Sequence, residues 1–388
     1  MPIRPIRLTP SVFRIASQSR LYLNRFHHGV LTSQNEIQVG CPLAAVPLLL
    51  YTDELVANSL MSNTKAVDVL VCGAGGFIAG WLVADLRKAG IGRIRAVDLK
   101  PLGEWNQRFE DVENLSLDLR NGEACRRAVE GGAANIYNLA ADMGGMGFIE
   151  NNKALCMLSV LINTQLLMAA RDAGVDRFFF ASSACVYNAD KQTDPNLTAL
   201  KEEDAYPAMP EDGYGWEKLF SERLCRHFTE DFDVFTSVAR YHNVYGPHGT
   251  YDGGREKAPA AICRKVISAQ LGSTKEIEIW GDGEQTRSFM YIDDCLKGTR
   301  MMLERGIPGP LNIGSNELVT INELVDIVED IAGVKLKRSY NLKAPKGVNG
   351  RNSDNTRTQA VLGWQPSISL REGLEKTYRW IYDEMAAR

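Results

Sequence analysis

A glycine-rich turn follows a short apolar run in the first third of the chain. The run Val67–Cys72 is rich in β-branched residues, as is typical of a buried parallel strand. It leads into Gly73-x-x-Gly76-x-x-Ala79, after which residues 81–89 have helical periodicity. Glycines in such a turn let the backbone approach a pyrophosphate, whose charge the helix N-terminus stabilises. The turn therefore predicts a dinucleotide-binding strand–loop–helix unit, although glycine turns alone join many strands to helices.

The same alternation of strand-like and helical segments continues along the chain. A long helical stretch is expected at residues 153–173. Further strand-like runs lie at residues 94–97, 135–140, 177–181 and 235–240. Strands that alternate with helices of this length specify an α/β fold with a doubly wound, Rossmann-type parallel sheet.

Beyond residue 245 this alternation loosens, and glycine and proline interrupt shorter elements. We therefore expect a nucleotide-binding domain at residues 63–245 and a smaller, mainly substrate-binding lobe at residues 246–388. Residues 288–305 of this lobe could return to the main sheet.

Asp98 ends the second predicted strand, 22 residues after Gly76. At this position an acid can accept hydrogen bonds from the ribose hydroxyls of adenosine and repels a 2′-phosphate, so NAD is favoured over NADP. We expect the loop residues Gly73, Gly76, Phe77 and Ile78 to bind the same cofactor.

Asp118 lies in Leu117-Asp118-Leu119, at the end of another strand-like pattern. Two interpretations are equally open. Its carboxylate could face the adenine of the cofactor, or it could cap a helix at residues 121–128.

Tyr214 and Lys218 are four residues apart, so on a helix they share one face. An ammonium beside a phenol stabilises the phenolate and lowers the pKa of the tyrosine from its ordinary value of about 10. Tyr214 is therefore a predicted general base, and both residues are expected to contact the cofactor. With the dinucleotide loop, the pair indicates hydride transfer at the carbinol carbon of a sugar-like alcohol. Ser183, after the predicted strand at 177–181, could hold the reacting hydroxyl, or could only stabilise its own turn.

The composition argues against several other functions. The formal net charge of −4 gives no electrostatic basis for binding nucleic acid. The eight cysteines are scattered without a C-x-x-C pair, so we expect no metal site and a reducing, cytoplasmic location. No apolar run reaches the roughly 20 residues that span a bilayer, so we expect no membrane association.

The N-terminal extension, residues 1–62, differs from the rest of the chain. Up to Gln34 it contains five arginines and no acidic residue, a composition typical of an organellar transit peptide. Targeting by residues 1–40 is therefore one interpretation. The other is an upstream stretch without function, with Met61 as the true first residue.

Several motifs together resemble the extended short-chain dehydrogenase/reductase family, which contains nucleotide-sugar epimerases and dehydratases. The resemblance covers roughly residues 66–385. Besides the glycine loop and Tyr214-x-x-x-Lys218, the segments that carry it are residues 141–148, 182–185, 253–259, 280–289 and 350–355. They are most similar to those of family members that invert C3 and C5 of a GDP-hexose. The family also implies a homodimer formed through two long helices.

The resemblance implies a role for individual residues. Tyr214 would be the redox base, Lys218 its partner and Ser183 the hydroxyl anchor, while Cys185 and Lys257 would be the epimerisation pair. The chemistry agrees, because oxidising C4 of a hexose to a ketone acidifies the hydrogens at C3 and C5. Inverting those carbons needs a base on one face of the ring and an acid on the other, and a thiol and a partly buried lysine can serve both roles near neutral pH.

Substrate recognition needs cations for a diphosphate, and arginine suits this better than lysine. The resemblance places Arg287, Arg351 and Lys265 near the diphosphate or the nucleoside. We expect Asn243 to hydrogen-bond the substrate, and the backbone at Gly144 and Gly145 to lie against the hexose. The polar segment at residues 191–196 is expected to be only a solvated loop.

The sequence thus predicts an NAD-dependent nucleotide-sugar epimerase that acts at C3 and C5. One alternative is a 4-epimerase or 4,6-dehydratase, against which Cys185 and Lys257 argue because a 4-epimerase needs no carbon base. The other is a non-catalytic protein that binds NAD or a nucleotide sugar, against which the complete set of Tyr214, Lys218 and Ser183 argues.

Overall fold

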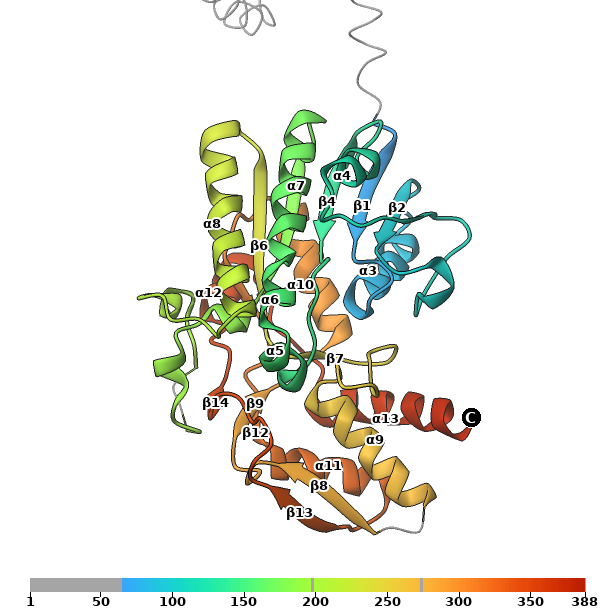
Figure 1. The fold of residues 1–388 in the computed structure, drawn as a ribbon, viewed down its shortest axis with the longest axis vertical. Helices are drawn as coiled ribbons and strands as arrows, with labels where there is room; N and C mark the ends of the chain where they lie inside the picture. The colour runs from blue at the N-terminus through green and yellow to red at the C-terminus, as the bar shows by residue number, and fades with distance from the viewer. Residues whose placement is uncertain (1–64, 197–198, 273–274, 388) are drawn as a thin grey trace, which may run out of the picture. The chain divides into compact units, whose positions relative to one another are not determined.

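The computed structural model describes residues 65–196, 199–272 and 275–387, so the N-terminal extension and both interpretations of it lie outside the described residues. Within these ranges, seven strands form one sheet whose neighbouring strands are all parallel (Figure 1), which confirms the predicted Rossmann-type sheet. Across the sheet the strands are β11 (Leu311–Ile313), β6 (Phe235–Tyr241), β5 (Arg177–Ser183), β4 (Ala133–Asn138), β1 (Val67–Cys72), β2 (Ile94–Asp98) and β3 (Glu113–Ser116).

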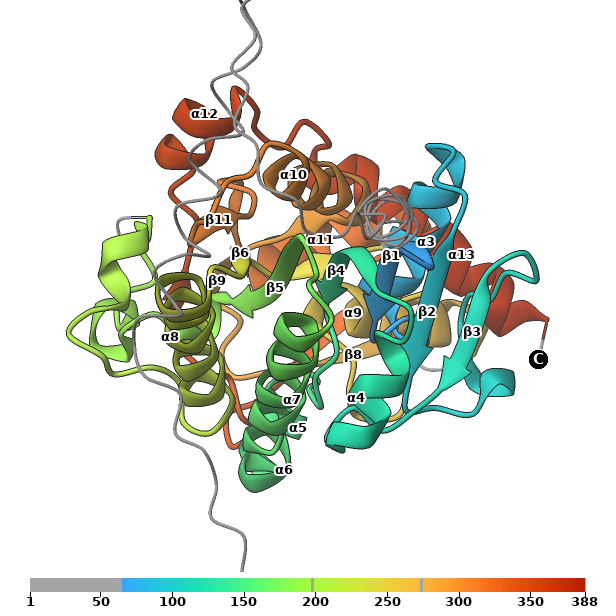
Figure 2. The same cartoon turned by 90° about the horizontal axis from the view of Figure 1, so that it is seen from above.

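Helices cover both faces of this sheet (Figure 2), and the alternation of side chains along β1 shows why. Leu70 and Cys72 pack in a core with α4, α7 and α8, whereas Val69 and Val71 pack on the opposite face with α3 and α10. These helices are α3 (Phe77–Lys88), α4 (Gly122–Ala128), α7 (Ser159–Asp172), α8 (Tyr214–Phe232) and α10 (Ile292–Glu304).

The smaller lobe gathers beyond the carboxyl ends of the parallel strands (Figure 1). Its elements are α9 (Ala258–Leu271), β8 (Glu276–Trp280), β9 (Thr286–Ser288), β12 (Leu318–Thr320), α11 (Ile321–Ala332), β13 (Lys337–Asn341), β14 (Gly350–Arg351) and α13 (Leu370–Ala386). Between the two parts, β7 (Val244–Tyr245) pairs with β10 (Met290–Tyr291). The chain then re-enters the sheet layer through α10, within the segment at 288–305, and continues in it as far as β11.

Shorter elements complete the fold. These are α5 (Met146–Asn151), α6 (Lys153–Met157), α12 (Thr356–Leu362) and the 3₁₀ helices η2 (Leu102–Glu104), η3 (Ala184–Val186), η4 (Ala189–Gln192) and η5 (Glu202–Ala205).

The stretch Lys153–Asp172, which comprises α6 and α7, is long and apolar enough to cross a membrane by length and composition alone, with a mean hydropathy of 1.5. The sequence analysis did not identify it. In the structure its inner face packs on the sheet, because Leu166 and Leu167 are fully buried. Its outer face exposes Leu161 and Met168.

Candidate active site

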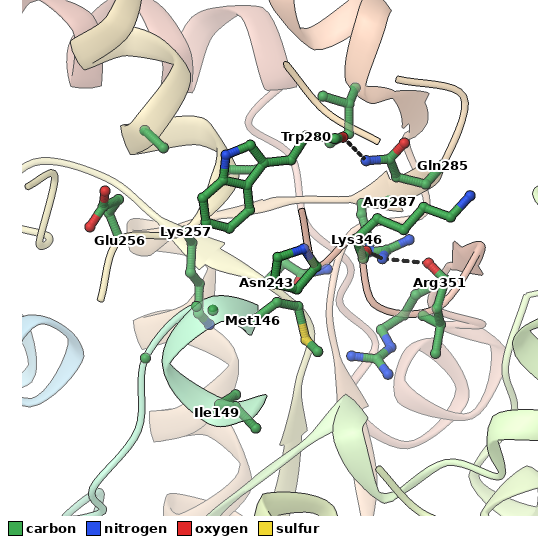
Figure 3. Close-up of a pocket in the computed structure, with 18 of the residues that line it drawn as sticks. Met146, Ile149, Asn243, Glu256, Lys257, Trp280, Gln285, Arg287, Lys346 and Arg351 are labelled. Carbon is green, nitrogen blue, oxygen red and sulfur yellow. Dashed lines mark hydrogen bonds between the residues drawn. The ribbon is translucent and has the colours of Figure 1, made fainter. Parts of the chain in front are cut away.

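A cavity of about 480 Å³ lies at the carboxyl ends of β4, β5 and β6 (Figure 3). Strand ends of this kind are where ligands bind in doubly wound sheets. The predicted residues that line it are Gly144, Gly145, Ser183, Cys185, Tyr214, Asn243, Lys257, Lys265, Arg287 and Arg351. The structure therefore brings Tyr214 and Ser183 together with the predicted epimerisation and substrate residues, while Lys218 is not part of the lining.

The glycine loop lies at the carboxyl end of β1 and fits a dinucleotide. Gly76 precedes α3 without any side-chain cap, and the first turn of the helix contains no acidic residue, so its N–H groups are available to an anion. Asp98 ends β2, where its carboxylate accepts hydrogen bonds from the backbone N–H of Gly75 at 3.0 Å and of Lys100 at 2.9 Å. This acid therefore lies against the loop, where it could meet the ribose of NAD.

Phe77 and Ile78 open α3 and pack partly buried against the core. Lys100 also reaches the loop, since its Nζ donates to the carbonyl of Gly75 at 3.2 Å. The side chains of Asp98 and Lys100 both hydrogen-bond the backbone of Gly75. These contacts fix the loop, whose backbone can then bind a pyrophosphate.

Asp118 does not cap a helix, so that interpretation is wrong. The N-cap of α4 is Asn121, whose side chain accepts a hydrogen bond from the N–H of Glu123 at 2.8 Å. Asp118 instead forms a two-pronged ion pair with Arg120, which holds the pKa of its carboxyl below the ordinary range. Its place beside the adenine stays a prediction.

Tyr214 is the first residue of α8, and Lys218 lies one turn later with its Nζ 5.5 Å from the phenol ring centroid. The lowering of the tyrosine pKa that we expected is absent. Burial raises the pKa of Tyr214 well above its ordinary value, and the nearby carboxylate of Glu217 acts in the same direction. The charge of Lys218 is shared with the buried carboxylate of Glu217, 3.6 Å away.

Ser183 and Cys185 occupy the sharp turn that follows β5. The Ser183 hydroxyl accepts a hydrogen bond from the N–H of Cys185 at 3.2 Å, and it opposes the rise in the pKa of Tyr214. Burial raises the pKa of the Cys185 thiol to about 11. Serine, tyrosine and thiol thus share one corner of the cavity.

Lys257 enters the cavity from the N-cap position of α9, and burial lowers the pKa of its amine. Two loops must approach closely to place it there. A Cβ atom on Gly145 would lie 2.3 Å from the carbonyl oxygen of Glu256, so only glycine fits. Gly144 and Gly145 therefore allow their loop to approach the loop that contains Arg255 and Glu256, at the edge of the cavity.

Arg287 and Arg351 lie on the same side of the cavity (Figure 3). Arg287 donates to the backbone carbonyls of Thr286, Lys346 and Val348, and among the described residues no ion pair with a carboxylate is found for it. Burial and the neighbouring charge of Arg351 lower its pKa to about 9. An arginine in this state is ready to receive an anionic group of a ligand.

The other two predicted substrate residues line the same wall through defined contacts. Asn243 has a positive φ of 42°, which asparagine tolerates better than most residues, and its Nδ2 donates to the carbonyl of Ser288 at 3.0 Å. Lys265 donates to the carbonyl of Glu278 at 2.8 Å, and its Nζ lies 5.8 Å from the ring centroid of Trp280.

Sequence reasoning missed several residues in or behind the cavity wall. Gln192, expected in a solvated loop, does not line the cavity but is buried and accepts a hydrogen bond from Nε of the lining residue Arg351 at 2.7 Å. Trp280 precedes a glycine motif, and Glu211 lies three residues before Tyr214, which are the signals that could have identified them. Lys346 lies in the lining without any local pattern.

Comparison with known proteins agrees with this geometry. The model of the NAD dependent epimerase/dehydratase family matches residues 69–314. A GDP-mannose 3,5-epimerase of Arabidopsis thaliana is 44% identical over 336 residues, which cover 86% of this chain and 87% of the relative. GDP-mannose 3,5-epimerase 1 of Oryza sativa subsp. japonica is 45% identical over 323 residues, 83% of each chain.

Among solved structures, MoeE5 in complex with UDP-glucose and NAD matches with a TM-score of 0.68 and 30% identity, over 82% of this chain and 99% of that one. The family that the motifs predicted is thereby confirmed, and with it an enzyme that uses NAD. The chain belongs to the NAD dependent epimerase/dehydratase family.

Proposed function

We propose that this chain is a nucleotide-sugar epimerase that acts on GDP-mannose and inverts C3, C5 or both. Two relatives named GDP-mannose 3,5-epimerase, at 44% and 45% identity, support the substrate. The structural observation that carries the proposal is the pair Cys185 and Lys257, which lines the same cavity as Tyr214 and Ser183. Tyr214 and Ser183 alone would support the C4 redox step of many family members. A thiol and an amine beside them can in addition transfer protons to and from carbon.

The redox half of the reaction belongs to Tyr214, Ser183 and Lys218. When bound, NAD supplies an acceptor and later a donor of hydride for C4 of the sugar. Ser183 orients the C4 hydroxyl, and Tyr214 takes its proton as the ketone forms. Lys218 stabilises the phenolate by its charge, which is needed because burial opposes ionisation of the phenol.

The epimerisation half belongs to Cys185 and Lys257. A base removes the proton from C5 or C3 of the ketone, the electron pair delocalises into the C4 carbonyl, and an acid delivers a proton to the opposite face. In the resting site the raised pKa of Cys185 favours the thiol, and burial lowers the pKa of Lys257, so its ammonium loses a proton more easily than that of an exposed lysine. Both shifts bring the two groups toward roles in proton exchange with carbon.

Recognition of the nucleotide is assigned to the arginines of the cavity. The buried Arg351 and the half-buried Arg287 offer two guanidinium groups to the diphosphate, and charge-assisted hydrogen bonds of this kind are among the strongest that proteins make. Trp280 lines the cavity while 42% exposed, so its ring can stack on a nucleobase at the entrance.

The direct test is product analysis. The purified full chain is incubated with GDP-mannose and separately with UDP-glucose, and the stereochemistry of each product is determined by NMR. We expect GDP-hexoses inverted at C3, C5 or both, and no such products from Cys185→Ala. A product inverted only at C4, a 4-keto-6-deoxy sugar, or binding without turnover would contradict the proposal and point to one of the alternatives.

We further propose that the protein is a cytoplasmic homodimer. The cysteines of the described ranges are all free thiols, which suits a reducing compartment, and cell fractionation of the full-length product tests this location. The second copy would cover the outer faces of α7 and α8, where Leu161, Met168, Trp216 and Phe220 are exposed. A pair of helices with exposed apolar residues suits a twofold, self-complementary interface.

A further inference from the structure

Glu211 places a carboxylate in the same corner of the cavity as the thiol of Cys185. It belongs to the segment that leads into α8, and its backbone N–H donates to the carbonyl of Cys185 at 3.0 Å. The start of α8 packs closely on the same carbonyl, because a Cβ on Gly215 would lie only 2.3 Å from its oxygen. The backbone thus fixes residue 211 beside residue 185.

The side chains of these two residues share one partner. Arg351 donates through Nη2 to Oε2 of Glu211 at 3.3 Å and through Nη1 to Sγ of Cys185 at 3.5 Å. The ion pair is largely buried, with 7% of the Arg351 side chain and 13% of the Glu211 side chain exposed. The charge of the Glu211 carboxylate raises the pKa of the thiol, whereas that of Arg351 lowers it.

The charges around the thiol would favour a thiolate if Glu211 were absent. The titratable and charged groups that face Cys185 are Arg351 from β14, Arg287 from β9, Lys257 from the start of α9, Tyr214 from α8 and Glu211 from the preceding loop. The basic groups in this set each stabilise a negative sulfur, and the nearby hydroxyl of Ser183 acts in the same direction. Glu211 is the carboxylate in the set, and it opposes them.

We infer that Glu211 is a positioning residue that keeps Cys185 in its neutral thiol form in the resting site, because its carboxylate compensates the charge of Arg351, which contacts both side chains. The inference deepens the proposed function, because a thiol that has kept its proton can donate it to carbon. It agrees with the raised pKa of Cys185, for which Glu211 is the largest contributor after burial.

The test needs no substrate. The rate of alkylation of Cys185 by iodoacetamide is measured between about pH 6 and pH 10 by mass spectrometry of the peptide that contains residue 185, since thiolate is the reactive form. Glu211→Gln keeps the size of the side chain and removes its charge. We expect the apparent pKa of the thiol to fall by about one unit, which is a roughly 10-fold faster alkylation at neutral pH.

Two further variants make the result specific. Arg351→Gln removes a cation and should shift the profile in the opposite direction. Glu256→Gln removes a carboxylate that lines the cavity but pairs with Arg264, and should leave the alkylation profile unchanged. A Glu211→Gln profile that superimposes on that of the wild type would overturn the inference while leaving the proposed function standing. A shifted alkylation profile together with no epimerised product from GDP-mannose would support the role of Glu211 and contradict the proposed function.

Discussion

At the scale of single residues, the cavity is dominated by cations that lack a full set of counter-ions. Within the part of the chain that the structure describes, Arg287 donates only to carbonyls, and Arg351 contacts one carboxylate, that of Glu211, together with the thiol of Cys185. Removing a guanidinium group from water costs free energy, and the contacts within the free protein offset only part of this cost. Ion pairs with a diphosphate would offset the remainder, so these arginines favour anionic ligands over neutral sugars.

This leads to a prediction for Arg287→Lys. Lysine keeps the charge but loses the planar fork of donors, so we expect GDP to bind about 10- to 100-fold more weakly, as for the loss of one charge-assisted hydrogen bond. Isothermal titration calorimetry with GDP measures this without turnover. Arg371→Lys, on the exposed side of α13, is the matched control and should bind GDP as the wild type does. Equal affinity of Arg287→Lys and wild type would exclude a diphosphate contact.

Side-chain roles were predictable where a local pattern exists and not where distant segments meet. Tyr214, Lys218, Ser183 and Cys185 lie in short motifs, and the cavity contains Tyr214, Ser183 and Cys185. The contact between Gln192 and Arg351 joins residues 159 positions apart, and no local sequence pattern around either residue indicates it. The pKa of Tyr214 was predicted in the wrong direction, because periodicity places Lys218 beside it but does not reveal how completely both are buried.

At the scale of elements, the site depends on the close approach of the loop before α5 and the loop before α9. The backbone N–H of Gly145 donates to the carbonyl of Arg255 at 3.0 Å, and the next carbonyl leaves no space for a side chain. Since Lys257 follows directly, the separation of these loops sets the position of its amine.

Gly145→Ala tests this arrangement. Gly145 has an ordinary φ of −70°, so alanine is conformationally acceptable and the effect comes from the clash alone. We expect kcat/KM to fall about 100-fold or more, as for a displacement of about 1 Å at a catalytic group. Gly92→Ala, which meets no atom within 4 Å, is the control and should keep full activity. A normal kcat/KM for Gly145→Ala would show that the loops do not set the position of Lys257.

Elements were predicted well where apolar runs are continuous. β1 has the predicted bounds, whereas α3 begins at Phe77 rather than residue 81, because helical dihedrals start directly after Gly76. The single helix expected at 153–173 is interrupted at Leu158. β11 is only three residues long, and its place in the main sheet follows from pairing with β6, which no local pattern indicates.

A prediction about α7 and α8 concerns their outer faces. Phe220, 55% exposed on α8, would be buried between two copies of the chain. Phe220→Asp would place a charge in that interface, so we expect a dimeric wild type and a monomeric variant by light scattering coupled to size-exclusion chromatography. Glu230→Gln, near the far end of α8, is the control. A monomeric wild type would refute the dimer.

At the scale of the whole molecule, Asn312 of β11 connects the sheet with the segments around the cavity. Its Nδ2 donates to the carbonyls of Leu200 at 2.8 Å and Asp354 at 3.0 Å, and its Oδ1 lies 2.9 Å from Nε2 of His242. His242 is fully buried and adjoins Asn243, so this network supports the wall that holds the substrate residues.

The network makes stability depend on pH in a defined window. Burial lowers the pKa of His242 from about 6.5 to about 3, so between these values the unfolded chain binds a proton that the folded chain does not. The stabilisation is fully present above about pH 6.5 and is lost as the pH falls. From pH 6.5 to 5.5 we expect the wild type to lose about 1 kcal/mol more than His242→Gln in the free energy of unfolding.

Denaturant titrations at both pH values measure this difference. His227→Gln changes a histidine on the exposed side of α8 and should keep the slope of the wild type. If His242→Gln and the wild type lose stability in parallel, the buried histidine is not the source of the dependence.

The central claim is that a 4-keto sugar exchanges protons with Cys185 and Lys257 before it is reduced again. Turnover of GDP-mannose in heavy water, with the position of deuterium mapped by NMR, tests it most directly. The account predicts label at C5, C3 or both and none at C4, since the hydrogen at C4 leaves and returns as hydride, and it predicts loss of the label in Cys185→Ala. Turnover without deuterium at either carbon would contradict it.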